Sequence, residues 1–242
     1  MIHTLSKQAS RSSLGQRLRA RARFALFATL SMMFCTTAQA SFQLESTGII
    51  LPESEKRVSF NIQNISSAPI LLVTKLIDLD GKDYSKRILI SPPITRIDAG
   101  QSQQVNFVLK DGPKLTEEVL LKAAFEGVSQ AAENTAKMPV RQDIGFLIQP
   151  AAVAQNKTPW EGLRFSVAQN QLTISNPSKH VIRMAPQVTL QPGNKTVPLT
   201  NFYLLPGQSE QISISTPPTS VTVIPLSRYG FKLPDVTLPV NP

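Results

Sequence analysis

The sequence predicts an all-β protein built from two β-sandwiches. Two observations support this fold class. Short segments of alternating apolar and polar residues are separated by Gly, Pro and Asn turns along the whole chain after residue 40. In addition, a pair of short motifs recurs once, at a separation near 110 residues. About fifteen short strands with turns every 8–12 residues are typical of β-sandwiches.

Residues 1–40 predict a secretory signal peptide. They carry six basic and no acidic residues, and an apolar run from Phe24 to Ala38 follows the last arginine. Ala38-Gln39-Ala40 then forms a small-x-small cleavage site. A membrane anchor is the alternative, but it needs about 20 apolar residues, and this run is shorter and contains Thr and Ser. We therefore expect export, removal of residues 1–40 and no stable membrane insertion of the chain that begins at Ser41.

The net charge does not indicate a nucleic-acid-binding protein. The chain has 242 residues, with 25 Lys and Arg against 16 Asp and Glu, a formal charge of +9. Six of the basic residues lie in the predicted signal peptide, which leaves 19 against 16 in the remainder. Those basic residues are not interleaved with aromatic ones, as nucleic-acid-binding surfaces require. We expect no nucleic-acid partner.

An internal repeat predicts two domains of one kind. The segment 98–107 is similar to 205–214, and 62–70 is similar to 174–182. Gly100 and Gly207 are thus 107 residues apart, and Asn64 and Asn176 are 112 apart. Two copies at nearly equal offsets favour a duplicated domain, although Gly-Gln-Ser turns also occur by chance in β-proteins. With a join near 151–159, we expect domains at 41–155 and 156–242.

The individual strands follow from local alternation. In the first half, 57–65 and 105–109 alternate as half-buried strands do. Residues 70–79 are apolar and run into Asp80-Gly81, which predicts a hairpin turn. The segment 116–128 has the composition of a helix or of a buried strand, and the lack of a clear cap at Gly127 favours the strand. The strands expected in the second half are 163–167, 171–175, 181–184, 187–190 and 211–215.

Residues that carry catalysis or bind metals are nearly absent. Cys35 lies in the predicted signal peptide, and His180 is the one histidine beyond it. Cys–His catalysis and a thiolate or multi-histidine metal site are therefore excluded, and we interpret His180 as a surface residue in a turn. The segment 78–83 lacks the later Glu of a calcium loop. We expect no catalytic residues, no metal and no cofactor, although two carboxylates meeting across the fold would still allow a β-sandwich enzyme.

The segment 138–148 has one apolar side. Its even positions are apolar except Gln142, whereas its odd positions are mostly polar or small. Such a strand either faces the core of its own sandwich or lends alternate side chains to a groove of another protein by β-strand addition. The candidate contact residues are Met138, Val140, Ile144, Phe146 and Ile148.

Three segments in order resemble the periplasmic chaperones of the chaperone–usher pilus pathway. They are Ser91–Gln101, with its Pro-Pro-Ile-x-Arg-Ile-x-x-Gly pattern, then Thr116–Leu121, then Ile144–Ala152 with its terminal Gln-Pro-Ala. Asn176-Pro177 and Tyr203–Gly207 are similar to landmarks of the family's second domain. The resemblance covers essentially the whole chain after the predicted signal peptide.

This resemblance implies two immunoglobulin-like sandwiches and a non-enzymatic function in the periplasm. Such a chaperone lends its last N-domain strand to an incomplete pilin or fimbrial subunit, until an outer-membrane usher exchanges it for the extension of another subunit. This donor-strand complementation is an established form of β-strand addition. The alternative is a secreted two-domain structural subunit or adhesin of a surface fibre.

The sequence departs from the family at the site that holds the subunit's terminal carboxylate. Family members usually place an Arg in the first strand and a Lys in the last strand there, and alignment puts Gly48 and Gly145 at these positions. Arg141 is the nearest cation on the same side of the strand, but it lies about 13 Å from Gly145 at strand rise. We expect binding without an Arg–Lys pair, mainly through apolar insertion and with weak salt dependence.

The residues that join the two domains also differ from the family pattern. The family's ionic trio aligns approximately with Glu118, Gln149 and Arg228. Gln149 replaces an Arg there, and Arg228 replaces an acidic residue. We expect a direct Glu118–Arg228 pair to compensate.

Overall fold

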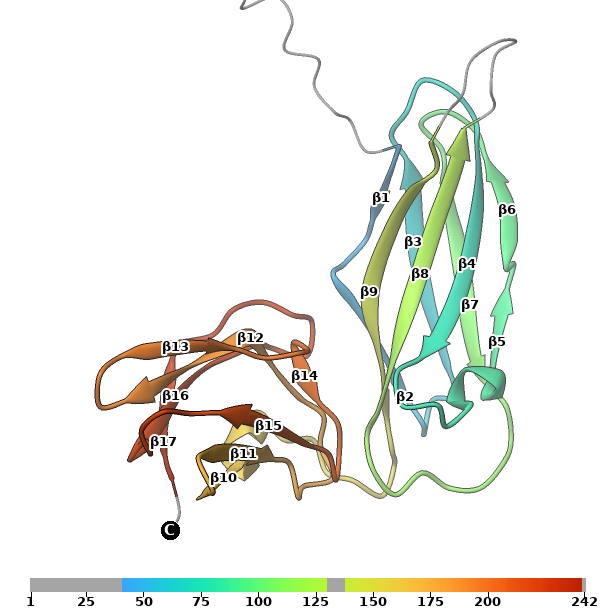
Figure 1. The fold of residues 1–242 in the computed structure, drawn as a ribbon. Helices are drawn as coiled ribbons and strands as arrows, with labels where there is room; N and C mark the ends of the chain where they lie inside the picture. The colour runs from blue at the N-terminus through green and yellow to red at the C-terminus, as the bar shows by residue number, and fades with distance from the viewer. Residues whose placement is uncertain (1–40, 130–137, 241–242) are drawn as a thin grey trace, which may run out of the picture. The chain divides into compact units, whose positions relative to one another are not determined.

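The computed structural model describes residues 41–129 and 138–240, which belong to one compact unit, Ala40–Pro242. The predicted signal peptide lies outside the described residues. Nearly all regular structure is β-strand, arranged as two sandwiches (Figure 1), so the predicted fold class is confirmed. Among the described residues, no helix is both long and apolar enough to cross a membrane.

The first sandwich consists of a four-stranded and a five-stranded sheet. The four-stranded sheet has the order β1 (Phe42–Leu44), β3 (Arg57–Asn64), β7 (Ser102–Leu109), β5 (Ile88–Ser91). The five-stranded sheet has the order β2 (Gly48–Pro52), β9 (Val140–Gln149), β8 (Val119–Ser129), β4 (Ile70–Asp78), β6 (Ile94–Ile97). β1 and β2 thus belong to opposite sheets, and β2 lies beside β9 at the edge of the five-stranded sheet.

The second sandwich begins after a short 3₁₀ turn at Pro159–Gly162. One sheet has the order β10 (Arg164–Ala168), β11 (Gln171–Ser175), β15 (Ser209–Ser213). The other contains β13 (Lys195–Pro198), β12 (Ile182–Gln191), β16 (Ser220–Pro225) and β17 (Val236–Pro239), and β14 (Tyr203–Leu204) also pairs with β12. The predicted strands 181–184 and 187–190 form one strand, β12, with a register shift between Met184 and Val188.

Each sandwich buries its own apolar core, because alternate side chains of each strand point between its two sheets. In the first core, Phe107 on β7 packs against Phe146 on β9 with ring centroids 5.1 Å apart. These two strands lie in opposite sheets, so the aromatic pair joins them. The second core includes the buried Trp160 of the 3₁₀ turn.

The internal repeat corresponds to one corner built twice. Asn64 and Asn176 are both fully buried, and each side-chain amide donates to two carbonyl oxygens, of Ala68 and Ile97 in the first case. Asn176 donates to the equivalent oxygens of His180 and Leu204. Each Asn also accepts a backbone hydrogen bond from the repeated glycine, at 3.0 Å for Gly100 and 2.8 Å for Gly207.

Three local expectations have clear outcomes. The segment 116–128 contains strand β8, as favoured, and pairs with both β4 and β9. The hairpin at Asp80-Gly81 is wrong: β4 pairs with β8 and β6, whereas the next strand, β5, pairs with β7 in the opposite sheet. The turn therefore carries the chain from one sheet to the other. His180 is not a surface residue, since its side chain is 17% exposed and lies beside Glu118.

Candidate functional site

One edge of β9 is free over half of its length. Along one side β9 pairs with β8 from Val140 to Ile148. Along the other side it pairs in parallel with β2, but only from Gly145 to Gln149. No strand within the described residues pairs with this second edge at 140–144. The backbone groups directed there are available to an added strand, which is the requirement for β-strand addition.

The side chains predicted to contact a partner divide into two groups. Phe146 and Ile148 are 0% and 1% exposed and belong to the first core, so for these two residues the core-facing interpretation is correct. They cannot contact another protein without unfolding the sandwich. Val140 and Ile144 are partly buried against the same core, and Met138 is 89% exposed. These three lie along or just before the free edge.

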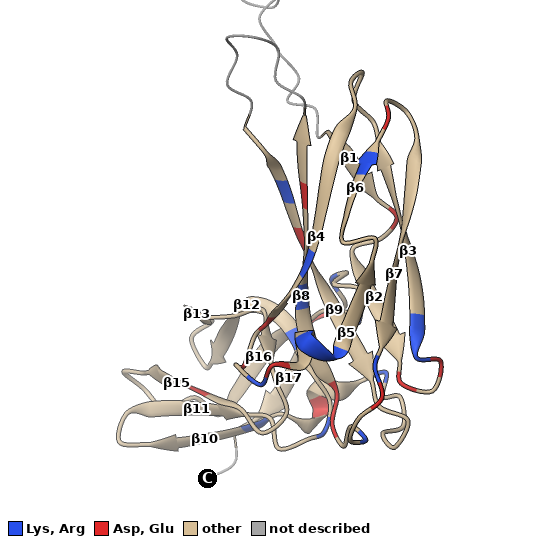
Figure 2. Cartoon of the chain, turned by 90° about the vertical axis from the view of Figure 1, so that its right-hand side faces the viewer, with Lys and Arg blue, Asp and Glu red and all other residues tan. Residues whose placement is uncertain are grey.

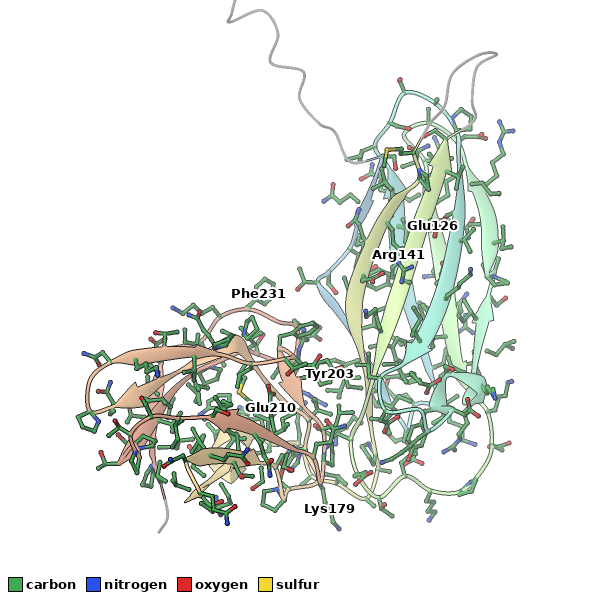
Figure 3. All side chains as sticks on the ribbon, in the orientation of Figure 1. Glu126, Arg141, Lys179, Tyr203, Glu210 and Phe231 are labelled. Carbon is green, nitrogen blue, oxygen red and sulfur yellow. The ribbon has the colours of Figure 1, made fainter. Side chains whose placement is uncertain are left out.

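An apolar groove of about 640 Å³ runs beside this free edge. Its walls include β1, and Gln142 donates from its side chain to the Phe42 carbonyl at 2.9 Å. Figure 3 labels Phe231, which is 60% exposed and also contributes to the groove. The apolar residues that line it are Phe42, Leu44, Ile65, Val140, Ile144 and Phe231.

The free edge ends where two glycines meet. Gly48 and Gly145 are direct partners at the start of the β2–β9 pairing. A Cβ atom on Gly48 would lie 3.3 Å from Cα of Tyr229, in the loop after β16. The Thr47 hydroxyl donates to the carbonyl of that same Tyr229 at 2.7 Å. Neither glycine supplies a charge, but the structure brings one to this point from the second sandwich.

That charge is the guanidinium of Arg183 on β12. A Cβ atom on Gly145 would lie 3.2 Å from its Nη1, and one on Gly230 would lie 3.0 Å from its Nη2. Arg183 is 8% exposed, and its Cζ lies 5.7 Å from the ring centroid of Phe202. Nη1 donates to the Arg228 carbonyl at 2.9 Å. Burial lowers the pKa of Arg183 from its ordinary value.

Sequence reasoning missed Arg183 because it looked for a replacement charge on the strands that carry the glycines. One local signal was present, namely a charged residue inside the apolar run Val181-Ile182-Arg183-Met184. Arg141, the cation considered instead, forms a salt bridge with Asp143 at 2.7 Å. Figure 3 shows Arg141 and Glu126 on the neighbouring strands β9 and β8, on which they are register partners.

The three residues expected to join the sandwiches are brought together. Glu118 is 5% exposed and accepts from Arg228 Nη2 at 3.4 Å and from the Val181 backbone at 2.9 Å. Arg228 also donates to the side-chain oxygen of Gln149. Beside this network, Leu120 and Leu147 of the first sandwich pack in one buried cluster with Val181 and Leu205 of the second.

The other charged residues that the structure describes are scattered over both sandwiches. Figure 2 shows lysines and arginines interspersed with acidic residues over the chain. The described residues contain no group of three or more His, Cys, Asp or Glu able to hold a metal ion.

Comparisons with known proteins agree with this architecture. Residues 41–154 match the family described as pili and flagellar-assembly chaperone, PapD N-terminal domain. The chain is 33% identical over 212 residues to the fimbrial chaperone YhcA of Escherichia coli K12, covering 86% of this chain and 93% of YhcA. It is 24% identical over 224 residues to the chaperone protein MrkB of Klebsiella pneumoniae, covering 86% and 95% of the two chains.

A solved structure of similar fold is the Salmonella enterica SafB chaperone in complex with the SafA pilin. Its TM-score is 0.70 at 20% identity, over 85% of this chain and 99% of that one. The identity and coverage shared with YhcA extend the family relationship from the first sandwich to the second. The family consists of chaperones and not of enzymes. This chain therefore belongs to the fimbrial chaperones of the chaperone–usher type.

Proposed function

We propose that this chain binds a fimbrial subunit in the periplasm by lending it the free edge of β9, and then delivers it to an outer-membrane usher. The observation that carries the proposal is the unpaired edge at 140–144 beside an apolar groove. An incomplete sandwich exposes an apolar groove of its own, and such surfaces aggregate unless another chain covers them. The free edge of β9 would fill the groove of the subunit, and the subunit would pair with the unpaired backbone groups of β9.

The likeness to SafB, which was solved with a pilin bound, supports a pilin subunit as the partner. The contact residues are Met138, Val140 and Ile144. Phe146 and Ile148 anchor β9 in the first core and keep the edge straight instead of touching the subunit. A strand fixed at one end by its own core offers a preorganised edge, which lowers the entropic cost of binding.

The domains proposed at 41–155 and 156–242 have separate roles in this function. The first provides the lent strand. The second provides the loop at Arg228–Gly230 and the buried Arg183, both of which lie against the end of the free edge. Export with removal of residues 1–40 would deliver the chain to the compartment in which fimbrial subunits fold.

Co-purification from the periplasm tests the proposal. The full-length gene, tagged at its carboxyl terminus, is expressed together with its neighbouring genes, and the periplasmic fraction is purified and identified by mass spectrometry. We expect a one-to-one complex with a fimbrial subunit and an amino terminus at Ser41. A chain found alone in the periplasm, or assembled at the cell surface as an adhesin would be, contradicts the proposal.

A further inference from the structure

We infer that Arg183 is the carboxylate-binding residue of this chain, and that it holds the terminal carboxylate of the strand added to β9. The inference deepens the proposed function and rests on it for the identity of the partner. It assigns the contact to a residue of the second sandwich, whereas the strands β2 and β9 contribute only glycines at this place.

Arg183 lacks a counter-charge among the described residues. Arg183 is more than nine-tenths buried, yet none of the salt bridges among the described residues involves it. Its Nε is buried and has no hydrogen-bond partner within residues 41–129 and 138–240. A buried charge is costly unless it is paired. The nearby Asp143 already accepts from Arg141 at 2.7 Å and lies 3.7 Å from Lys122.

The free N–H donors of Arg183 have the geometry that a carboxylate requires. Nη1 is used by the Arg228 carbonyl, so Nε and Nη2 remain. These two nitrogens form one side of the planar guanidinium, and two parallel N–H groups match the two oxygens of a carboxylate. Arg183 also lines a cavity of about 240 Å³ that reaches Ile144 and Gly145 of β9. The cavity therefore places Arg183 beside the end of the free edge.

A strand added to the free edge of β9 must end close to Arg183. From Gly145 onward the edge of β9 is occupied by β2, beginning at Gly48. A strand paired with 140–144 therefore lies in line with β2 and stops beside these glycines, next to Arg183. If it runs parallel to β9, as β2 does, its carboxyl end is there. An antiparallel strand would bring its amino end to the same point, where it offers no carboxylate to the guanidinium.

The absence of side chains at Gly145 on β9 and at Gly230 in the loop after β16 is part of this arrangement. A Cβ atom on Gly145 would lie within 3.5 Å of three atoms of the guanidinium group, and Gly230, with φ +91°, approaches it from the other side. Any larger residue at either position would press on the Arg183 side chain. The glycines thus leave room for an arginine that arrives from β12.

Nuclear magnetic resonance on the free chain tests the site without any subunit. The Nε–Hε signal of Arg183 in arginine-labelled protein is identified by its loss in Arg183→Lys and is followed during titration with sodium acetate. We expect a saturable shift with acetate and none with acetamide at matched ionic strength. A signal that responds to neither probe, or to both alike, overturns the inference whatever the fate of the proposed function.

A double-variant cycle tests the assignment to the chain terminus. The captured subunit is prepared with a free and with an amidated carboxyl terminus. Each form is bound to the unaltered chain, to Arg183→Met and to the control Arg164→Met, whose side chain is exposed on β10. We expect amidation to weaken binding to the unaltered chain and to the control by roughly ten- to a hundredfold. For Arg183→Met the same modification should change the affinity by less than about twofold.

Other outcomes of the cycle contradict the inference. If amidation weakens binding to Arg183→Met as strongly as to the unaltered chain, Arg183 has only a structural role. A second outcome is that neutralising an Asp or Glu side chain of the subunit weakens binding to the unaltered chain but not to Arg183→Met, while amidation affects both chains equally. In that case the site binds a side chain and not the terminus. Failure of all three chains to capture any subunit contradicts the proposed function, while the acetate titration still decides about Arg183.

Discussion

Gly48 on β2 and Gly145 on β9 are direct partners at the point where the free edge of β9 ends. The space beside Gly145 is occupied by the guanidinium of Arg183 from the second sandwich, whereas Gly48 faces the backbone of Tyr229 and Arg228. A charge at this place is thus supplied by a strand that is nearly 40 residues further along the chain. The packing of the two sandwiches thus places a charged group where β2 and β9 have none.

Subunit capture should depend on the free half of β9. Val140→Asp and Ile144→Asp each place a carboxylate in a groove that must become dry on binding, which costs several kcal/mol. We expect the affinity for the subunit to fall by about a hundredfold or more. Affinity is measured with the purified subunit complex, and folding is checked by circular dichroism.

The matched control for these variants is Val236→Asp on β17. This valine is also partly buried against its own core and lies on an edge strand, but it belongs to the second sandwich. It should lose a similar amount of stability and keep subunit capture. If all three variants unfold, or if Val236→Asp also abolishes capture, the lent-strand interpretation is wrong.

Moving the positive charge back to β9 should first damage and then restore binding. Gly145→Lys alone puts a second cation against Arg183 and crowds its guanidinium, so we expect a loss of roughly 1–3 kcal/mol in stability. It should also weaken subunit binding. In the double variant with Arg183→Met, the new lysine has space and is the cation that pairs with the terminal carboxylate of the subunit. Subunit binding should therefore recover most of its strength. Recovery is absent if Arg183 acts only through packing of the second sandwich.

The Glu118 carboxylate should stabilise the contact between the sandwiches. Glu118→Ala leaves the Val181 backbone N–H without its acceptor and Arg228 without its carboxylate partner, and removing one partner of a largely buried pair costs about 3–5 kcal/mol. Because Arg228 is 19% exposed, the lower end of this range is expected. Urea denaturation followed by the fluorescence of Trp160 provides the measurement.

Glu117→Ala is the control for that variant. Glu117 pairs with Lys82 at 3.1 Å, and both side chains are substantially exposed. Exposed pairs of this kind contribute about 0–1 kcal/mol. Equal losses for the two variants would show that the buried network adds nothing specific.

The repeated corner should have nearly the same energetic weight in both sandwiches. Asn64→Ala and Asn176→Ala each remove a buried amide that donates to two carbonyl oxygens. Leaving such groups unsatisfied costs about 1–3 kcal/mol each, so a loss of roughly 2–5 kcal/mol is expected for either variant. Hydrogen exchange, which follows each sandwich separately, should show that the variant sandwich loses protection. Asn61→Ala, on the exposed side of β3, should have little effect.

Most of the fold could be predicted from the sequence. Alternation is a local property, so 57–65, 105–109 and 171–175 identified their strands directly. The paired Asn and Gly-Gln-Ser motifs indicated the duplication because one corner needs the same hydrogen bonds in both copies. The turn at Asp80-Gly81 was placed correctly, but its role was not, since no local pattern says to which sheet the next strand belongs.

The candidate site was only partly predictable for the same physical reason. The sequence alone determined that 138–148 forms a strand with an apolar side, and that Gly48 and Gly145 offer no charge. Tertiary structure alone decided which part of that side belongs to the core, because Phe146 is buried by Phe107 from the opposite sheet. It also decided that Arg183 lies against Gly145. Contacts between distant segments depend on how the strands pair and how the sandwiches pack. The periodicity of apolar residues along the chain predicts neither.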